Sequence, residues 1–358
     1  MRKIELLEST GSEKVDLILQ GIIGVLEVSF PGRIRCYYLG GSYSDGTGVD
    51  IGKTMNSSDL DFFAIFKDDF QEGEAEKFGQ LVGACNQLSP IMLDAHPEAE
   101  YNLCCEDKTP SILNIIIRDA SLLLYGEDIR ARIAPMPLDS YLCHVINHGF
   151  FHSGIARQSG KLATFPLTMP LAYPLNYIDP KGEYYGYDYR PKRSNGEFDP
   201  PGTRLLVAMA LWPATIILGL KAGRYTGTKG GSVRLYQETI NDVWTGLIEQ
   251  IFNSCKIQWG YIAPSGAEDR QILRELCRKV LDLENYAFGL CKDYLLGVLE
   301  HKEDRHKLEA LVCLQNMVYP GDEIVKALKQ LENSENAELQ KAVMQTLAVQ
   351  QQFGKTIE

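Results

Sequence analysis

The chain has 358 residues, a formal net charge of -11, 45% hydrophobic residues and 23% charged residues. This length is enough to bury a large core in two or three domains. The acidic balance argues against a partner that is bound mainly through phosphate contacts, because such binding needs clustered Lys and Arg. The composition therefore argues against nucleic acid and favours a small or cationic partner, although an acidic surface also serves solubility alone.

The cysteines and the N-terminus bear on the compartment. Nine cysteines are scattered along the chain without a C-x-x-C pair, which indicates reduced core thiols. The N-terminal sequence MRKIELLESTGSEKVDL carries charges where a secretory signal needs an apolar stretch, and no segment has eighteen uninterrupted apolar residues. We expect a cytoplasmic protein without a membrane segment. No pattern in the sequence determines an oligomeric state.

The first part of the chain alternates helical and strand patterns. Apolar spacing and turn residues predict a helix over 12–28, a strand over 34–39, a loop with a short helix over 40–58, a strand over 59–66, a helix over 72–88 and a strand over 90–95. The apolar segment 112–125 fits a helix or a strand and stops at Gly126. These elements predict an α/β (α+β) catalytic domain with a small mixed sheet over residues 1–132.

The rest of the chain is mainly helical in pattern. Helices are predicted over 139–153, 204–221, 232–255 and 268–299, which together form a mainly α domain over residues 133–300. Within it, residues 165–202 are dense in Pro, Tyr, Gly and Asp. The aromatic content of this insertion argues against disorder and favours a packed lid or a ligand-binding face, with a purely structural excursion as the alternative.

The last segment, 301–358, has a different pattern. Two amphipathic stretches, LEALVCLQ at Leu308 and QKAVMQTLAV at Gln340, lie about thirty residues apart with a break at Pro320-Gly321. This spacing predicts a short tail of HEAT-like helical repeats, in which two similar units follow one another. We therefore treat 301–358 as a third region with its own helices.

Two aspartates alternate with apolar residues in SSDLDFFAIF, which starts at Ser57. Residues two apart in a strand face the same way, so Asp59 and Asp61 should project from one face while Leu60 and Phe62 face the other. Two adjacent carboxylates repel each other unless a cation or protons compensate them, and oxygen ligands of this kind select a hard divalent ion. The pattern predicts a Mg²⁺ site, with Mn²⁺ as the alternative ion.

A glycine-serine turn precedes the two aspartates. Gly40, Gly41 and Ser42 follow the predicted strand over 34–39, and glycine at such a turn allows a triphosphate to approach the main-chain N–H groups. One motif would hold phosphate and the other would hold the metal. Phosphoryl transfer needs little more than positioning and neutralisation of developing negative charge.

Together these motifs resemble the nucleotidyltransferase superfamily, whose pattern is a Gly-Ser turn, a strand with the pattern hDhD (h for apolar) and a third carboxylate on a neighbouring strand. In this chain Asp94 matches the third carboxylate, with Glu98 and Glu100 as fallbacks. The distance along the chain from Ser42 to Asp59 is longer than the family usually shows. The resemblance therefore implies an insertion near residues 46–56.

Two later segments resemble bacterial antibiotic nucleotidyltransferases, including the aminoglycoside adenylyltransferases. These segments are LLLYGEDIR at Leu122 and LKAGRYTGTKGGSVRLY at Leu220. The likeness implies that Lys229 reaches the triphosphate and that Tyr236 lies near the nucleoside. The predicted nucleotide-binding residues are Gly40, Gly41, Ser42, Ser58, Lys229 and Tyr236. The resemblance spans about residues 10 to 300 and is looser after residue 130.

The resemblance implies the reaction as well. An acceptor hydroxyl would attack the α-phosphate of ATP or another nucleoside triphosphate, and pyrophosphate would leave. Asp59 and Asp61 would bind the metal, and Asp94 would bind the metal nearer the acceptor and could take its proton. A separate glutamate base stays open as an alternative.

Three function hypotheses remain. The first is transfer of a nucleoside monophosphate to a small-molecule hydroxyl, for example of an aminoglycoside-like polyol. The second keeps this chemistry on a tRNA end, a protein or a second nucleotide, and the third is a non-catalytic nucleotide-binding regulatory module. A stripe of His144, His148 and His152 at helical spacing would fit a metal site, but packing or a pocket wall is favoured because no carboxylate or cysteine joins it.

Overall fold

The computed structural model describes residues 4–54, 56–105, 110–157, 162–170, 182–188, 196–197 and 200–354. The chain divides into two compact units, of which the first comprises Met1–Pro137 and Thr226–Ser232 and the second Leu138–Tyr225 and Val233–Glu358. The first contains a mixed sheet with helices and the second is mainly helical, which confirms the predicted fold class at this coarse level. The predicted division into three regions stays a prediction.

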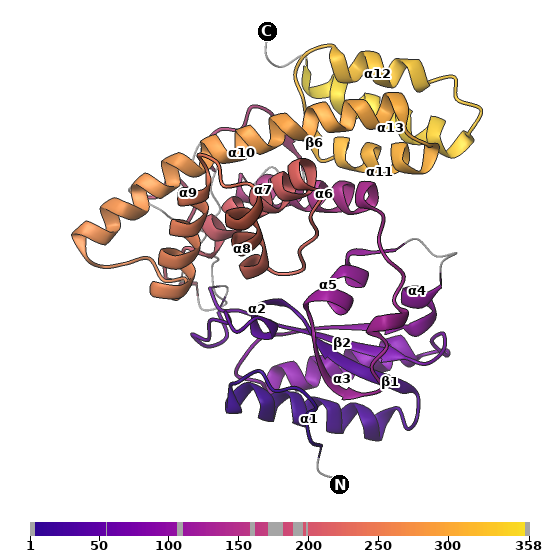
Figure 1. Ribbon diagram of the computed structural model, residues 1–358, viewed down its shortest axis with the longest axis vertical. Helices are drawn as coiled ribbons and strands as arrows, with labels where there is room; N and C mark the ends of the chain where they lie inside the picture. The colour runs from indigo at the N-terminus through magenta and orange to yellow at the C-terminus, as the bar shows by residue number, and fades with distance from the viewer. Residues whose placement is uncertain are drawn as a thin grey trace. The chain divides into compact units, whose positions relative to one another are not determined.

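A four-stranded sheet forms the centre of the first unit (Figure 1). Its strands are β1 (Ile34–Leu39), β2 (Leu60–Phe66), β3 (Leu93–Ala99) and β4 (Leu122–Gly126), in the spatial order β3-β2-β1-β4. β1 runs antiparallel to β2 and to β4, whereas β2 and β3 are parallel. The mixed sheet that the sequence predicts is therefore present.

The two faces of the sheet bury different side chains. Leu60, Phe62 and the alternate residues after them pack with α1 (Glu13–Ser29) and α3 (Glu74–Leu88). Phe63 and Ile65 pack on the other face, with residues of α4 (Glu100–Cys104) and α5 (Ile112–Ala120). Because successive strand residues alternate between faces, Asp61 projects on the α5 side together with Phe63.

Several predicted bounds in the first unit differ from the structure. The strand expected over 90–95 is β3, Leu93–Ala99, because pairing with β2 continues in register as far as Ala99. The ambiguous segment 112–125 contains both α5 and β4. Ser111 ends the ambiguity locally, since its hydroxyl oxygen accepts from the Leu113 N–H and forms a capping box with Asn114. Two short elements also belong to the unit: α2 (Gly41–Ser44), which follows β1, and the 3₁₀ helix η1 (Arg130–Arg132), which follows β4.

The second unit begins with long helices. They are α6 (Leu138–Ala156), α7 (Arg204–Ala222), α8 (Lys229–Thr239, whose first residues belong to the first unit), α9 (Thr245–Gln250), the π-helix η3 (Ile251–Gln258) and α10 (Ala267–His301). The prediction of one helix over 232–255 was wrong, because the chain leaves the helix at Asn241, whose φ is +47°. Asp242 then accepts a hydrogen bond from the Trp244 N–H and starts the next turn.

The C-terminal segment is helical, as the sequence predicts. It contains α11 (Asp304–Leu314), α12 (Glu323–Leu331) and α13 (Ala337–Gly354), with the short strand β6 (Met317–Val318) paired in parallel to β5 (Ala163–Thr164). In the contact grouping it belongs to the second unit. Most of the predicted insertion over 165–202 lies outside the described residues.

A buried ion pair joins α6 to α10. The Arg157 guanidinium donates to both carboxylate oxygens of Glu284 at 3.1 and 3.0 Å, and the two side chains are 1% and 0% exposed. Ser153 and Tyr187 donate their hydroxyls to the same carboxylate at 2.9 and 2.7 Å. Arg157 also donates to the Thr168 carbonyl, so this pair anchors parts of the segment between α6 and α7.

α7 is long and apolar enough to cross a membrane by length and composition, but 72% of its apolar window is buried inside the protein. A core helix of a soluble protein has the same properties, so this finding favours neither location. All nine cysteines lie in the described ranges as free thiols, and six of them are buried. The cytoplasmic location stays a prediction.

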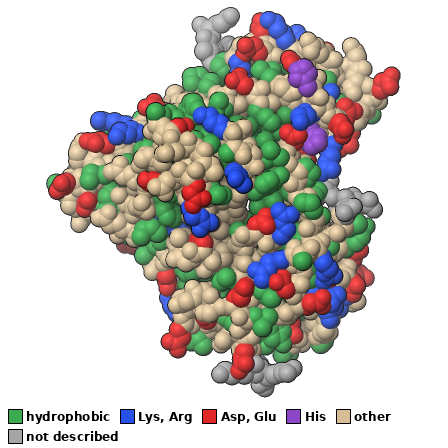
Figure 2. Space-filling model, viewed as in Figure 1, with side chains coloured by type: hydrophobic (Ala, Val, Ile, Leu, Met, Phe, Trp, Pro, Cys, Tyr) green, Lys and Arg blue, Asp and Glu red, His purple; other side chains and the backbone are tan. Residues whose placement is uncertain are grey.

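The surface charge of the first unit is mixed. In the face that Figure 2 shows, its Lys and Arg side chains lie among Asp and Glu side chains. Several of them form ion pairs, for example Arg33 with Glu74 and Arg130 with Asp128. This distribution matches the acidic composition.

Candidate active site

Two of the predicted carboxylates are neighbours across the sheet. Asp61 on β2 and Asp94 on β3 are register partners, as are Phe63 and His96 two residues further on. Residues opposite each other in adjacent strands project on the same face, so these four side chains share the α5 side of the sheet. Asp59 lies one residue before β2 begins. The pairing therefore brings together two carboxylates that are distant in the sequence.

The charge of these carboxylates is visible in the acidity of Asp61. Burial and, after it, the negative charges of Asp59 and Asp94 together raise the pKa of Asp61 to about 7. Lys229 and His96 act in the opposite direction but do not cancel the effect. The charges of all four groups therefore act on the Asp61 carboxylate.

The glycine-serine turn lies directly against Asp61. The Gly40 N–H donates to the Asp61 carbonyl at 2.8 Å, so the main chain after β1 stays beside β2. Gly41 has φ +66°, and a Cβ there would lie 1.7 Å from Oδ2 of Asp61. At Gly40 a Cβ would lie 2.9 Å from Cε2 of Phe63. Both glycines are therefore required by close approach, and at Gly41 also by the left-handed conformation.

Ser42 follows Gly41 in α2. Its carbonyl accepts from the Thr47 N–H at 2.9 Å, while Ser44 donates to the carbonyls of Gly41 and Ala120 at 2.8 and 2.9 Å. These hydrogen bonds fix the turn that follows β1 and hold it against the end of α5. The Ser42 side chain remains the predicted phosphate contact.

The predicted insertion near residues 46–56 is an ordered loop where it is described. Ser58 is 3% exposed, and its hydroxyl oxygen accepts from the Val49 N–H at 3.0 Å. The Ser57 hydroxyl donates to the Val49 carbonyl at 3.0 Å and accepts from the Ile51 N–H. Ser58 thus has a structural contact, and its predicted contact with nucleotide stays a prediction.

Lys229 comes from far along the chain. It lies in the segment Thr226–Ser232 of the first unit. A Cβ on Gly227 would lie 2.6 Å from Cβ of Ala120, and one on Gly230 would lie 2.8 Å from Oδ2 of Asp45, so this segment packs closely beside α5 and the loop after α2. The positive charge of Lys229 lowers the pKa of Asp61. The structure thus brings Lys229 to the carboxylates.

Tyr236 belongs to the second unit. It is fully buried, and its hydroxyl donates to Oδ1 of Asp242 at 3.0 Å within that unit. Burial raises its pKa strongly. These contacts are structural, and the predicted proximity of Tyr236 to a nucleoside stays a prediction.

Sequence reasoning missed His96. Its Nε2 lies 3.0 Å from Oδ1 of Asp94, and its ring stacks on Phe63 with a centroid distance of 5.8 Å and an interplanar angle of 22°. The hydrogen bond raises the pKa of His96 and lowers that of Asp94. The signal available in the sequence was the spacing of two residues from Asp94, which places both side chains on one face of a strand.

A second missed residue is Tyr43 in α2. Its hydroxyl is buried without a hydrogen-bond partner in the described structure, and its ring lies against Gly48. Burial raises the pKa of Tyr43 to about 12, with further contributions from Asp50 and Asp59. The hydroxyl therefore lies within electrostatic reach of Asp59.

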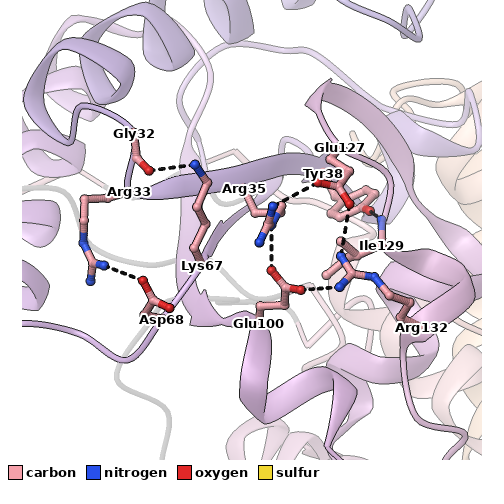
Figure 3. A network of polar contacts seen from close by, with 10 residues as sticks. All are labelled: Gly32, Arg33, Arg35, Tyr38, Lys67, Asp68, Glu100, Glu127, Ile129 and Arg132. Carbon is pink, nitrogen blue, oxygen red and sulfur yellow. Dashed lines mark hydrogen bonds and ion pairs between the residues drawn. The ribbon is translucent and has the colours of Figure 1, made fainter.

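The fallback carboxylates serve other contacts. Glu98 accepts from Nδ2 of Asn102 at 2.7 Å. Glu100 pairs with Arg35 at 2.8 Å and with Arg132 at 2.6 Å, and Glu127 pairs with both arginines (Figure 3). This ring of four charges joins β1, α4 and η1. Asp94 is thus the carboxylate that pairs in register with Asp61.

The donor set fits a hard divalent cation in its chemistry. Asp59, Asp61 and Asp94 offer only carboxylate oxygens, the ligands that Mg²⁺ and Mn²⁺ prefer. Burial raises the pKa of Asp61, and the charges of the other two carboxylates contribute to the rise. Among the described residues, no group of three His, Cys, Asp or Glu side chains is arranged so that it could hold a metal ion. The metal site therefore stays a prediction that rests on the chemistry of the three aspartates.

The histidine stripe on α6 packs against an aromatic residue. The rings of His148 and His152 stack on Trp212 of α7 at centroid distances of 5.2 and 5.6 Å, and His144 lies beside His148. Burial lowers the pKa of His144 to about 4. These contacts favour the packing interpretation of the stripe.

Comparison with known proteins adds no assignment, because no protein-family model and no curated protein matches this chain.

Proposed function

We propose that this protein is a Mg²⁺-dependent nucleotidyltransferase that transfers a nucleoside monophosphate, AMP from ATP in the simplest case, to a hydroxyl group of a small molecule and releases pyrophosphate. The observation that carries the proposal is the register pairing of Asp61 with Asp94 beside a glycine turn, with Asp59 two residues before Asp61. There, the pKa of Asp61 is raised to about 7 by burial and by the other two carboxylates.

The arrangement of charge supports phosphoryl transfer over a purely structural role. Buried carboxylates in a structural setting are normally paired with cations or hydrogen-bond donors of the protein. At Asp61 the effect of the neighbouring carboxylates exceeds that of Lys229 and His96. Binding of a divalent ion would stabilise such a site by relieving the repulsion between its carboxylates. The bound ion would also neutralise charge on the phosphates.

The residues of the site have different roles in this proposal. Asp59, Asp61 and Asp94 hold the metal, and Lys229 adds a positive charge for the triphosphate beside them. Gly41 leaves room for the Asp61 carboxylate, because any side chain at that position would occupy its place. The turn at Ser42 offers a hydroxyl and main-chain N–H groups to phosphate oxygens.

The proposed acceptor is a small molecule, and a cationic polyol fits the charge best. The chain carries a net charge of -11, which opposes binding of a polyanion such as tRNA. Transfer to a small molecule is therefore favoured over transfer to a nucleic acid. A non-catalytic nucleotide-binding module would use the same carboxylates only to bind the nucleotide. Release of pyrophosphate distinguishes an enzyme from such a module.

The test is Mg²⁺-dependent release of pyrophosphate from ATP in the presence of a panel of hydroxyl acceptors, including aminoglycosides. We expect Asp59→Asn and Asp61→Asn to lower the rate by at least about 10³-fold, because metal binding contributes several kcal/mol to stabilising the transition state. Asp68→Asn is the matched control, since Asp68 is exposed and pairs with Arg33. Its rate should equal that of the unchanged protein.

Two outcomes would contradict the proposal in different ways. Mg²⁺-dependent ATP binding without pyrophosphate release for any acceptor would favour the non-catalytic module. Absence of any Mg²⁺-dependent ATP binding by the folded protein would exclude both functions at this site.

A further inference from the structure

Asp94 is the most exposed of the three carboxylates. Its side chain is 51% exposed, and β3 is an edge strand whose described pairing is with β2 alone. An exposed aspartate populates several rotamers, and fixing one of them on metal binding costs conformational entropy. A protein that uses such a carboxylate as a ligand therefore benefits from a neighbouring group that already holds it.

His96 is placed to do this. It follows Asp94 by two residues on β3, so both side chains project on the same face as Asp61. Its Nε2 lies 3.0 Å from Oδ1 of Asp94, which is within the range of a charge-assisted hydrogen bond. One carboxylate oxygen of Asp94 is thereby engaged and the other is left for a cation.

The His96 ring is itself supported by Phe63. The two rings stack at 5.8 Å, and Phe63 is 2% exposed and packed in the core. Gly40 in turn packs against the Phe63 ring, since a Cβ at Gly40 would lie 2.9 Å from Cε2 of Phe63. A continuous line of contacts thus runs from Gly40 through Phe63 and His96 to Asp94.

We propose that His96 is a positioning residue for the metal site: its Nε2–H donates to Oδ1 of Asp94 and orients this carboxylate toward the divalent ion held by Asp59 and Asp61. This inference rests on the proposed function of the same site. Hydrogen bonds from groups behind a metal ligand orient the ligand, and their loss typically lowers metal affinity or activity by about 10 to 100-fold.

Two substitutions separate the hydrogen bond from the packing. His96→Phe keeps a ring for Phe63 but cannot donate, whereas His96→Gln retains an N–H donor at a similar reach without the aromatic ring. His301→Ala is the matched control, because His301 is 77% exposed on α10 and also lies beside a carboxylate, that of Glu300, at 3.4 Å. His96 itself is 47% exposed, so the fold should tolerate these changes.

The experiment titrates the full chain with Mn²⁺ and measures the free ion by electron paramagnetic resonance. We expect His96→Phe to weaken Mn²⁺ binding about tenfold, His96→Gln to stay within about threefold of the unchanged protein and His301→Ala to leave binding unchanged. The Mg²⁺ concentration for half-maximal ATP binding should shift in the same order. If His96→Phe fails to fold, His96→Ala replaces it with the same expectation.

The failures of the two proposals can be told apart. If Asp61→Asn abolishes Mn²⁺ binding but His96→Phe binds Mn²⁺ as tightly as the unchanged protein or more tightly, the metal site stands and the role of His96 is overturned. Equal loss in His96→Phe and His96→Gln would also overturn it, since packing rather than the hydrogen bond would then be responsible. If Asp61→Asn binds Mn²⁺ as the unchanged protein does, both proposals fall.

Discussion

The surroundings of Asp61 in the first unit and of Glu284 in the second unit have opposite effects on a buried carboxylate. Glu284 is fully buried, and Arg157, Ser153 and Tyr187 supply four hydrogen bonds to its two oxygens. Asp61 is placed beside two other carboxylates, and their repulsion adds to burial in raising its pKa. The first arrangement stabilises the fold, whereas the second stores unfavourable charge that a ligand can relieve.

The difference teaches how to separate a structural charge from a functional one. A carboxylate whose removal weakens the fold has partners from the protein itself. A carboxylate whose neutralisation strengthens the fold was retained for another reason. Three substitutions test this contrast directly.

The largest effect is expected at the buried ion pair. Glu284→Gln removes the negative charge that the buried Arg157 guanidinium contacts through two hydrogen bonds, which should lower the free energy of unfolding by about 3–5 kcal/mol. Urea denaturation followed by circular dichroism measures this change. Asp322→Asn is the control, because Asp322 forms an exposed pair with Lys326 and should contribute about 0.5 kcal/mol or less. A loss below about 1 kcal/mol for Glu284→Gln would contradict the structural role.

An intermediate effect is expected at Gly41. Gly41→Ala places a Cβ 1.7 Å from Oδ2 of Asp61 in a backbone conformation with φ +66°, so the turn or the carboxylate must move. The free energy of unfolding should fall by about 2 kcal/mol, and Mg²⁺-dependent ATP binding should be lost with it. Gly21→Ala serves for comparison, since nothing lies within 4 Å of a Cβ there in α1 and the change should be neutral or stabilising. Wild-type ATP binding by Gly41→Ala would show that the turn is not part of the site.

The smallest effect has the opposite sign. Asp61→Asn removes one of three mutually repelling charges and should raise the free energy of unfolding at pH 8 by about 1 kcal/mol in metal-free buffer. Adding Mg²⁺ should then raise the Tm of the unchanged protein and leave that of the variant constant. Asp128→Asn should instead lower stability, because Arg130 holds the pKa of Asp128 at about 2. Destabilisation by both substitutions would remove the contrast between the two kinds of carboxylate.

The site was predictable where its chemistry is local in sequence. The alternation of Asp59 and Asp61 with apolar residues predicts a strand with both carboxylates on one face, and β2 begins one residue after Asp59. Gly40 and Gly41 were predicted from their place after an apolar strand, and their close approach to Phe63 and Asp61 gives the physical reason for glycine. The helix over 232–255 was wrong because periodicity does not register a single residue in the left-handed conformation, here Asn241.

What the sequence by itself determined is the identity of the alternating carboxylates, the glycine turn and the first three strands, since each depends on residues close along the chain. The family resemblance pointed to Asp94 and Lys229, but only the tertiary structure shows how they are brought to Asp61, and it alone adds His96. Parallel pairing of β3 with β2 sets Asp94 opposite Asp61 and His96 opposite Phe63, and the return of Thr226–Ser232 to the first unit brings Lys229 near them. The physical reason is that strand register and chain return depend on burying the whole core, which no local pattern of residues specifies.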